Sequence, residues 1–260
     1  MSIIGMGSWL QTASGRCLLE WEQRCLDAAV ADAFGFHALQ LGLPELDALR
    51  ANRMPQRWLA DETATDARVL LRCEFDALPF AADSIDLVVL PHVLEFAADP
   101  HLTLREVERV LRPEGRVVIA GFNPTSLWGL RQRLSRLRLG LPAAEGGAEA
   151  SRVGEFIGYW RLRDWLRLLG FAIEGGQFGC WRPPLRGERW LARLQWMDRV
   201  GERWWPVLGG AYLLQGVKRV KGMRLVGLAR AQPRRAARAT TAAIAPREGA
   251  AAHHREREPA

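Results

Sequence analysis

The residues best able to grip a small ligand lie in the stretch "FGFHALQLGLPELD", residues 34–47. A short apolar run ending at Gly42 predicts a buried strand, and Pro44 suits the first turn of a helix. A strand, a tight turn and a helix start commonly hold a nucleotide-type cofactor, since glycine lets the backbone approach the ligand. Such loops usually carry two or three glycines, whereas this one has only Gly42. The sequence therefore predicts a cofactor loop that keeps its shape but has altered chemistry.

Acidic residues and a histidine follow the other predicted strands. Asp61 or Glu62 ends the weaker predicted strand 56–62, and His92 follows the predicted strand 84–91. His92 is the best-placed candidate for a general base if an acceptor must lose a proton. The alternative is that its ring only hydrogen-bonds the local backbone. The catalytic residue therefore stays unassigned.

The four cysteines do not point to a metal site or a disulfide framework. They show no CxxC spacing and no partnered histidine cluster, which favours a reducing, cytoplasmic compartment. The N-terminus lacks the pattern of a signal peptide, and the most apolar stretch is too short to span a bilayer. We therefore expect no metal and no transmembrane segment.

Strand-like and helix-like segments alternate along the chain. The helical spacing of apolar residues predicts an amphipathic helix that ends at Gly35, and a short helix is expected from Pro44. Strands are expected at 56–62, 67–75, 84–91 and 116–122, and a surface helix at 102–111. This alternation indicates an α/β fold with a doubly wound, mainly parallel sheet, in which ligands bind at the carboxyl ends of the strands.

The second half predicts further elements whose roles stay open. The Leu/Arg helix 127–139 can be a lid, a membrane-surface helix or a plain cover packed on the domain. A helix ending at Gly170, an edge strand at 172–179 and a last strand at 211–220 are also expected. The tryptophan-rich helix 188–206 can stack a ring-shaped acceptor, or its tryptophans can be core.

Charge is concentrated at the C-terminus. Residues 217–260 hold eleven of the 36 Lys/Arg and three of the 29 Asp/Glu, so the rest of the chain is nearly neutral. The tail has almost no large apolar residues and cannot bury enough surface to fold alone. It is either a solubilising segment or a weak contact for nucleic acid or an anionic membrane. We divide the chain into a helical segment 1–34, a domain 35–228 with a mobile loop 139–152, and a disordered basic tail 229–260.

Residues 73–124 carry a family resemblance. An acid, "LPF", a strand "IDLV" and then "RVLRP" occur in the order and spacing typical of class I S-adenosylmethionine-dependent methyltransferases, the "type 11" small-molecule subgroup most closely. The resemblance implies a Rossmann-like methyltransferase fold with a seven-stranded sheet and an N-terminal helix. It also implies S-adenosyl-L-methionine as cofactor and methyl transfer to a small or lipid-like acceptor that the sequence does not identify.

The resemblance also implies roles for particular residues. Glu74, with Phe75 beside it, matches the acid that contacts the adenine amino group, and a carboxylate suits that donor. Leu90 and His92 belong to the turn whose backbone carbonyls meet the methionine amino group. Asp61 or Glu62 would hold the ribose hydroxyls.

The glycine loop is where the chain departs from the family. Gln40 stands at the position of an acid, Gly42 and Leu43 form the turn, and Pro44 replaces a second glycine. Gln40 can orient the loop by hydrogen bonds, but it cannot pair with the cofactor's ammonium. Two hypotheses follow: a divergent methyltransferase, or a catalytically inactive member of the fold that binds or scaffolds a partner. A third, RNA-directed methylation through the basic tail, rests on charge alone.

Overall fold

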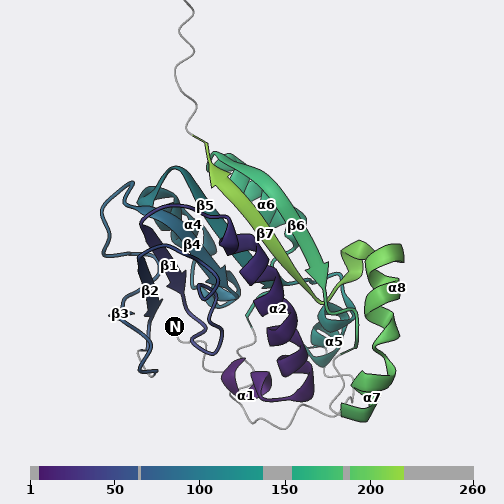
Figure 1. The fold of residues 1–260 in the computed structure, drawn as a ribbon. Coiled ribbons are helices and arrows are strands. Elements are labelled where there is room, and N and C mark those ends of the chain that lie inside the picture. Colours follow the sequence, from purple (N-terminus) through teal and green to yellow (C-terminus); the bar gives the residue numbers. More distant parts are fainter. Residues whose placement is uncertain (1–5, 64–65, 137–153, 184–187, 220–260) are drawn as a thin grey trace, which may run out of the picture. The chain divides into compact units, whose positions relative to one another are not determined.

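The described residues form a sheet with helices on both faces (Figure 1). The computed structural model describes residues 6–63, 66–136, 154–183 and 188–219. Its strands are β1 (His37–Leu41), β2 (Gln56–Asp61), β3 (Leu71–Arg72), β4 (Ile85–Pro91), β5 (Leu111–Phe122), β6 (Phe171–Gly179) and β7 (Ala211–Lys218). Its helices are α1 (Met6–Leu10), α2 (Ala13–Ala31), α3 (Val93–Phe96), α4 (Pro100–Val110), α5 (Leu127–Arg136), α6 (Tyr159–Leu168), α7 (Glu188–Arg193), α8 (Trp196–Trp204) and the 3₁₀ turn η2 (Pro206–Leu208).

The sheet has seven strands in the order β3-β2-β1-β4-β5-β7-β6. Strands β1 to β5 pair in parallel, and β7 runs antiparallel to both β5 and β6. Chain order reverses between β1 and β4, which creates a switch point at their carboxyl ends. The predicted doubly wound, mainly parallel α/β fold with an N-terminal helix is confirmed.

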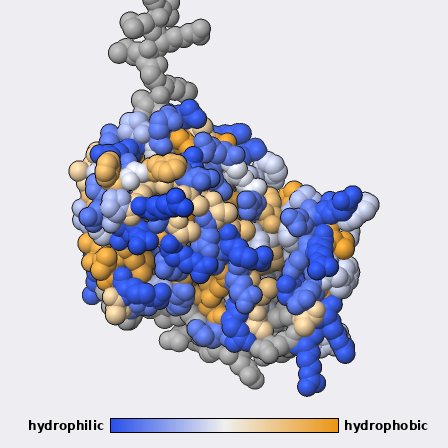
Figure 2. Space-filling model, viewed as in Figure 1, coloured by the Kyte–Doolittle hydropathy of each residue, from blue (hydrophilic) through white to orange (hydrophobic). Residues whose placement is uncertain are grey.

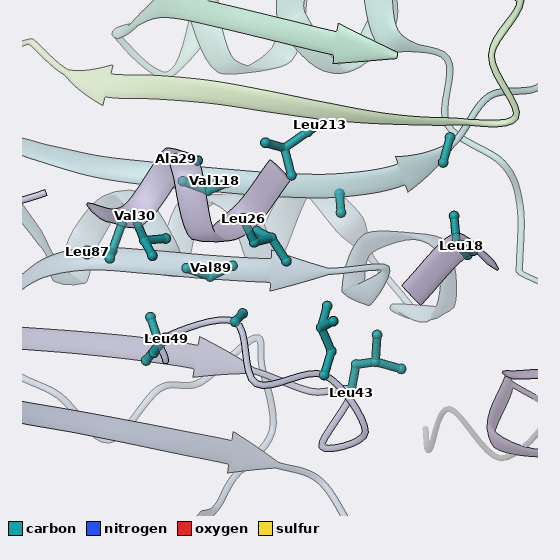
Figure 3. Close-up of a cluster of buried hydrophobic side chains, with 14 of the residues drawn as sticks. Leu18, Leu26, Ala29, Val30, Leu43, Leu49, Leu87, Val89, Val118 and Leu213 are labelled. Carbon is teal, nitrogen blue, oxygen red and sulfur yellow. The ribbon is translucent and has the colours of Figure 1, made fainter. Parts of the chain in front are cut away.

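Each face of the sheet is covered by its own set of helices, and the outer surface is predominantly hydrophilic in the view of Figure 2. Because side chains alternate across a strand, β4 contributes Leu87 and Val89 to one core and Val88 and Leu90 to the other. Helices α1 and α2 pack on the first face, where Figure 3 shows α2 residues against β4 and β5. Helices α4 and α6 cover the second face.

Helix α2 starts at a capped end, where the Thr12 hydroxyl accepts a hydrogen bond from the Gly15 N–H at 3.2 Å. It ends at Ala31, so the prediction that it runs to a capping Gly35 is wrong. Gly35 instead lies against Asp86, where an added Cβ would come within 2.4 Å of the carboxyl carbon. The Asp86 carboxylate accepts hydrogen bonds from the backbone N–H groups of Phe36 and His37, which fixes the start of β1.

Two other predictions in this half differ from the structure. The segment 43–55 forms turns instead of the short helix expected from Pro44. Its side chains Leu46, Leu49 and Met54 still pack in the first core, so apolar burial is achieved without helical hydrogen bonds. The strand expected over 67–75 shrinks to β3, since only its central residues pair with β2.

The second half follows the sequence more closely. Helices α4 and α6, the edge strand β6 and the last strand β7 are found where predicted, and Gly170 follows α6 with a left-handed φ of 89°. The single helix expected over 188–206 is divided into α7, α8 and η2. The loop expected at 139–152, the end of the helix expected over 127–139 and the tail at 229–260 lie outside the described residues. Across the described ranges, no helix combines the length and apolar character that crossing a bilayer requires.

Candidate functional site

Two left-handed turns lie side by side at the switch point. Gly42 and Leu43 follow β1 with φ values of 68° and 49°, and His92 follows β4 with a φ of 55°. The two strands pair directly, with Leu39 opposite Val88. Left-handed residues other than glycine are uncommon and cluster at functional sites, because the surroundings must over-determine them. The location and the backbone geometry therefore mark this edge of the sheet as the candidate site.

Gln40 holds the β1 turn together. Its Nε2 lies 3.1 Å from the Gly42 carbonyl, 3.1 Å from that of Leu43 and 2.8 Å from that of Leu46. Its Oε1 accepts the Ala48 N–H at 3.0 Å. Both ends of this buried amide are satisfied inside the loop, so the expected orienting role of Gln40 is observed.

The Leu43 side chain points into the core instead of the ligand space. It is 1% exposed and belongs to the same buried cluster as Leu10 and Leu18 of the N-terminal helices. Only the backbone of this residue is therefore available to a cofactor.

A buried ionic cluster holds the β4 turn together. His92 Nδ1 lies 2.8 Å from Glu95 Oε2, and its Nε2 lies 2.6 Å from Glu22 Oε1. All three residues are buried, and the Phe122 N–H donates to the other Glu95 oxygen. The His92 ring also packs on the Phe122 ring, with centroids 4.2 Å apart. The cluster thus joins α2, the β4 turn and the end of β5.

The cluster keeps His92 charged. Burial opposes protonation of the imidazole, but the carboxylates of Glu22 and Glu95 outweigh it and raise the pKa of His92 to about 10. Burial also raises the pKa of the Glu95 carboxyl above its usual value, against the pull of the neighbouring imidazolium. Both ring nitrogens of this enclosed side chain bond carboxylates, so neither is available to take a proton from an acceptor. The structure therefore contradicts the hypothesis that His92 is a general base, and its ring bonds carboxylates and not the backbone.

Glu22 is a residue that sequence reasoning missed. Its Oε2 is buried and has no hydrogen-bond partner among the residues that the structure describes. Glu22 stands four residues after Leu18 and four before Leu26, within the stripe of α2 that faces the core. An acid inside an apolar helical stripe is a readable signal, since buried carboxylates are costly unless they are paired or used.

The acids expected to bind the nucleoside part of the cofactor lie at the ends of β2 and β3. Asp61 is buried, and its two oxygens accept from the Glu62 N–H at 2.7 Å and the Thr63 hydroxyl at 3.2 Å. The backbone N–H of Cys73 bonds the Asp61 carbonyl, which brings Glu74 next to this strand end. Glu74 is exposed, whereas Phe75 is buried in the core.

The remaining predicted residue, Leu90, lies in the core of the second face, so only its backbone can face a ligand. No group of His, Cys, Asp and Glu side chains within the described ranges has the arrangement of a metal site.

Comparison with known proteins bears on this site. A "Methyltransferase domain" family matches residues 50–119, from the crossover after β1 to β5. The uncharacterized protein YafS of Escherichia coli (strain K12) is 30% identical over 172 residues, covering 66% of this chain and 68% of that protein. The malonyl-[acyl-carrier protein] O-methyltransferase of Laribacter hongkongensis is 30% identical over 161 residues, covering 57% of this chain and 50% of that enzyme.

Solved structures share the fold at low identity. An S-adenosylmethionine-dependent methyltransferase from Archaeoglobus fulgidus superposes with a TM-score of 0.53 and 15% identity, covering 77% of this chain and 94% of that one. A second from Mesorhizobium loti gives a TM-score of 0.51 and 18% identity, with coverage of 76% and 97%. The same family is indicated by the strand order, by the turns at the switch point and by these matches. The chain belongs to the class I S-adenosylmethionine-dependent methyltransferases, in the type 11 subgroup.

Proposed function

We propose that the protein transfers a methyl group from S-adenosyl-L-methionine to a small or lipid-like acceptor. The observation that carries the proposal is the pair of left-handed turns at the carboxyl ends of β1 and β4, where ligands bind in doubly wound sheets. Family membership implies the cofactor, and the residues present fit it on both its nucleoside and its amino-acid side. Four free cysteines are in keeping with action in the cytoplasm.

On the nucleoside side, Glu74 accepts a hydrogen bond from the adenine amino group. Its exposed carboxylate stands beside the end of β2, so the geometry leaves it available. Asp61 or Glu62 holds the ribose hydroxyls. Because Asp61 already accepts two hydrogen bonds in its own turn, its remaining lone pairs would serve the ribose.

On the amino-acid side, the turn backbones of Gly42, Leu43, Leu90 and His92 surround the methionine part. Glu22 of α2 does not replace the acid that the loop lacks at Gln40, because its side chain is fully enclosed and bonds His92. Gln40 then positions the loop without touching the cofactor's charge.

The chemistry asks little of the protein beyond alignment. The bound cofactor supplies an activated methyl group, which passes to the acceptor while the electron pair of the broken carbon–sulfur bond stays on sulfur. Both ring nitrogens of His92 bond carboxylates, and an acceptor that is already ionised at neutral pH would need no base there. A carboxylate on an acyl chain has this property, and the Laribacter relative is named for methylating a malonyl group on acyl carrier protein.

The second candidate function is a methyltransferase fold without catalysis that binds or scaffolds a partner. It is favoured by the loop itself. The Gln40 amide hydrogen-bonds groups of its own loop, and Pro44 lacks the backbone N–H that a glycine would provide there. Losing one charge-assisted contact typically weakens binding by about ten- to a hundred-fold. Under this alternative the cofactor pocket is a remnant.

Calorimetric titration with S-adenosylmethionine and S-adenosylhomocysteine separates the two candidates. Micromolar binding of both, lost in Glu74→Ala but kept in the control Asp164→Ala on α6, supports the proposed cofactor site. Transfer of radiolabelled methyl to malonyl-acyl carrier protein or to free fatty acids then identifies the acceptor class. Binding without transfer to any acceptor supports the second candidate, and unchanged affinity in Glu74→Ala refutes the assignment of Glu74.

A further inference from the structure

The segment after β6 exposes an unusual number of tryptophans. The exposed fractions are 58% for Trp190, 57% for Trp196, 70% for Trp204 and 57% for Trp205. The interpretation of these residues as core is therefore wrong. Single exposed apolar residues are ordinary, but several in one short segment mark an interaction surface.

Helix α8 is anchored so that its tryptophans must face outward. Its Gly201 packs against the Trp181 ring, where an added Cβ would come within 2.3 Å of ring carbon. Asp198 on α8 pairs with Arg182 at 2.6 Å, and the Trp181 Nε1 donates to the Trp205 carbonyl at 2.9 Å. These contacts fix the inner side of the helix and leave Trp196 and Trp204 on the solvent side.

Arginines surround these tryptophans. Residues 188–208 contain four arginines and three acids; of the acids, Asp198 pairs with Arg182 and Glu202 is exposed. We call the following exposed set the tryptophan face: Arg189, Trp190, Arg193, Trp196, Arg199, Arg203, Trp204, Trp205, Val207 and Leu208. The Arg193 guanidinium lies 5.5 Å from the centre of the Trp190 ring. Figure 2 shows this region as a largely blue projection with pale and orange side chains among the blue.

Helix α5 also combines arginines with exposed apolar side chains. Residues Leu127–Arg136 contain three arginines and no acid, and Leu127 and Leu130 are 47% and 52% exposed. The Trp128 Nε1 donates to the Arg182 carbonyl at 2.6 Å, which ties α5 to the segment that leads into α7.

We propose that the tryptophan face docks on the surface of an anionic lipid bilayer. Tryptophan prefers the boundary between headgroups and acyl chains, and arginines pair with lipid phosphates while their stems cover apolar surface. An amphipathic helix with this composition binds in the plane of the interface. The docking is independent of the proposed methyl transfer.

A second copy of the chain and a nucleic acid both fit the tryptophan face less well than a lipid surface. A second copy of the chain would bring the same arginines face to face across a two-fold contact, which is repulsive. A nucleic acid would satisfy the arginines and stack on tryptophan, but Leu127, Leu130, Val207 and Leu208 gain little from bases. A lipid interface accepts the basic, aromatic and aliphatic groups together.

The tryptophan face borders the carboxyl edge of the sheet. Turn η2 leads into β7, whose first residue Ala211 pairs with Phe122, the last residue of β5. A protein docked in this way would hold the candidate site near the membrane surface, within reach of an acyl or other lipid-borne molecule.

Sedimentation of the full-length chain with vesicles tests the proposal. The unaltered protein should bind vesicles of phosphatidylcholine and phosphatidylglycerol more strongly than pure phosphatidylcholine, and less as salt rises. The variant Trp196→Ser/Trp204→Ser should lose at least about tenfold in partition coefficient. The charge variant Arg199→Glu/Arg203→Glu should lose binding to the anionic vesicles selectively.

Matched controls come from α6, where Trp160 is also 52% exposed and Arg167 is exposed. Trp160→Ser and Arg167→Glu should bind vesicles as the unaltered chain does. The basic residues after 220 remain in every variant, so any binding that they provide is common to all.

Three results would overturn the proposal. The first is no vesicle binding, and the second is equal binding by the tryptophan variant. The third is a tryptophan-dependent partner of another class: single-stranded RNA bound in place of vesicles, or a dimer that the double variant dissociates.

Discussion

The turns after β1 and β4 have the same backbone conformation but are held by opposite chemistry. Each places a residue other than glycine in the left-handed region, Leu43 in one and His92 in the other. The β1 turn is fixed by the neutral amide of Gln40, which bonds groups within its own loop. The β4 turn is fixed by charges, an imidazolium between carboxylates that come from α2 and α3.

The two turns differ in how far along the chain their stabilising partners lie. The Gln40 amide bonds partners within eight residues, and the Gly42 N–H adds a hydrogen bond to the Ala60 carbonyl of β2 at 2.7 Å. The β4 turn depends on Glu22, which is 70 residues away in the chain. Helix α2 therefore supplies a charged partner to the β4 turn, whereas it meets Leu43 of the β1 turn only in the apolar core.

The largest expected effect comes from breaking the ionic cluster. Glu95→Ala removes one carboxylate from the enclosed His92 and leaves the Phe122 N–H without its acceptor. Breaking a buried ion pair by removing one partner costs about 3–5 kcal/mol, because the other charge stays buried and unpaired. Urea unfolding monitored by circular dichroism measures this loss.

The control for that variant is Glu106→Ala on α4, whose carboxylate pairs with the partly exposed Arg109 and accepts a hydrogen bond from the Leu78 N–H. Partly exposed pairs contribute about 0–1 kcal/mol, so this change should be far milder. Equal losses of unfolding free energy in the two variants would show that the buried cluster contributes no more to stability than a partly exposed ion pair.

The second-largest loss of stability is expected when Gln40 of the β1 turn is replaced. Gln40→Ala leaves buried carbonyls and the Ala48 N–H unpaired, at a cost of about 2–4 kcal/mol. Gln40→Glu restores the acid typical of the family but sets a carboxylate beside three carbonyls. Its stability should therefore fall as the pH rises and the carboxyl ionises. Unfolding curves for both variants across pH check this, and an unchanged stability in Gln40→Glu would refute the hydrogen-bonding role.

The pH dependence of the unaltered chain should come from the β4 turn. The folded pKa of His92, about 10, lies above its unfolded value of 6.5. A raised pKa means that the stabilisation is complete below the unfolded value and is lost as the pH rises through the folded one. We expect about 2–3 kcal/mol less stability near pH 9 than near pH 7 from this group.

The variant His92→Gln isolates that contribution. It lacks the titrating ring, so its free energy of unfolding should change less over the same pH interval than that of the unaltered chain. Parallel pH profiles of the two proteins would mean that His92 is not the charged centre of the cluster.

The comparison also explains what the sequence could reveal. Strands β1, β4, β5 and β7 and helices α4 and α6 were predictable because apolar periodicity records which side of each element is buried. The role of Gln40 was predictable for a related reason, since its partners lie within eight residues in the chain.

Long-range features could not be predicted in this way. Nothing near His92 in the sequence announces Glu22 as its partner, because the two residues are 70 positions apart in the chain. The turns at 43–55 and the division into α7 and α8 likewise depend on tertiary packing, which overrides local helix propensity. The outward tryptophans depend on the anchor between Gly201 and Trp181, which joins separate segments.

The smallest expected effect tests whether backbone geometry or Gln40 sets the β1 turn. Gly42 has a φ of 68°, a conformation that costs residues with a Cβ about 1–2 kcal/mol. Gly42→Ala should lose about that amount with no pH dependence, and Gly42→Asn should lose less because asparagine tolerates the left-handed region. Equal losses for Ala and Asn would instead indicate steric crowding around the turn. If both losses are small while Gln40→Ala unfolds the chain readily, the amide and not the glycine is what keeps this degenerate loop in its family shape.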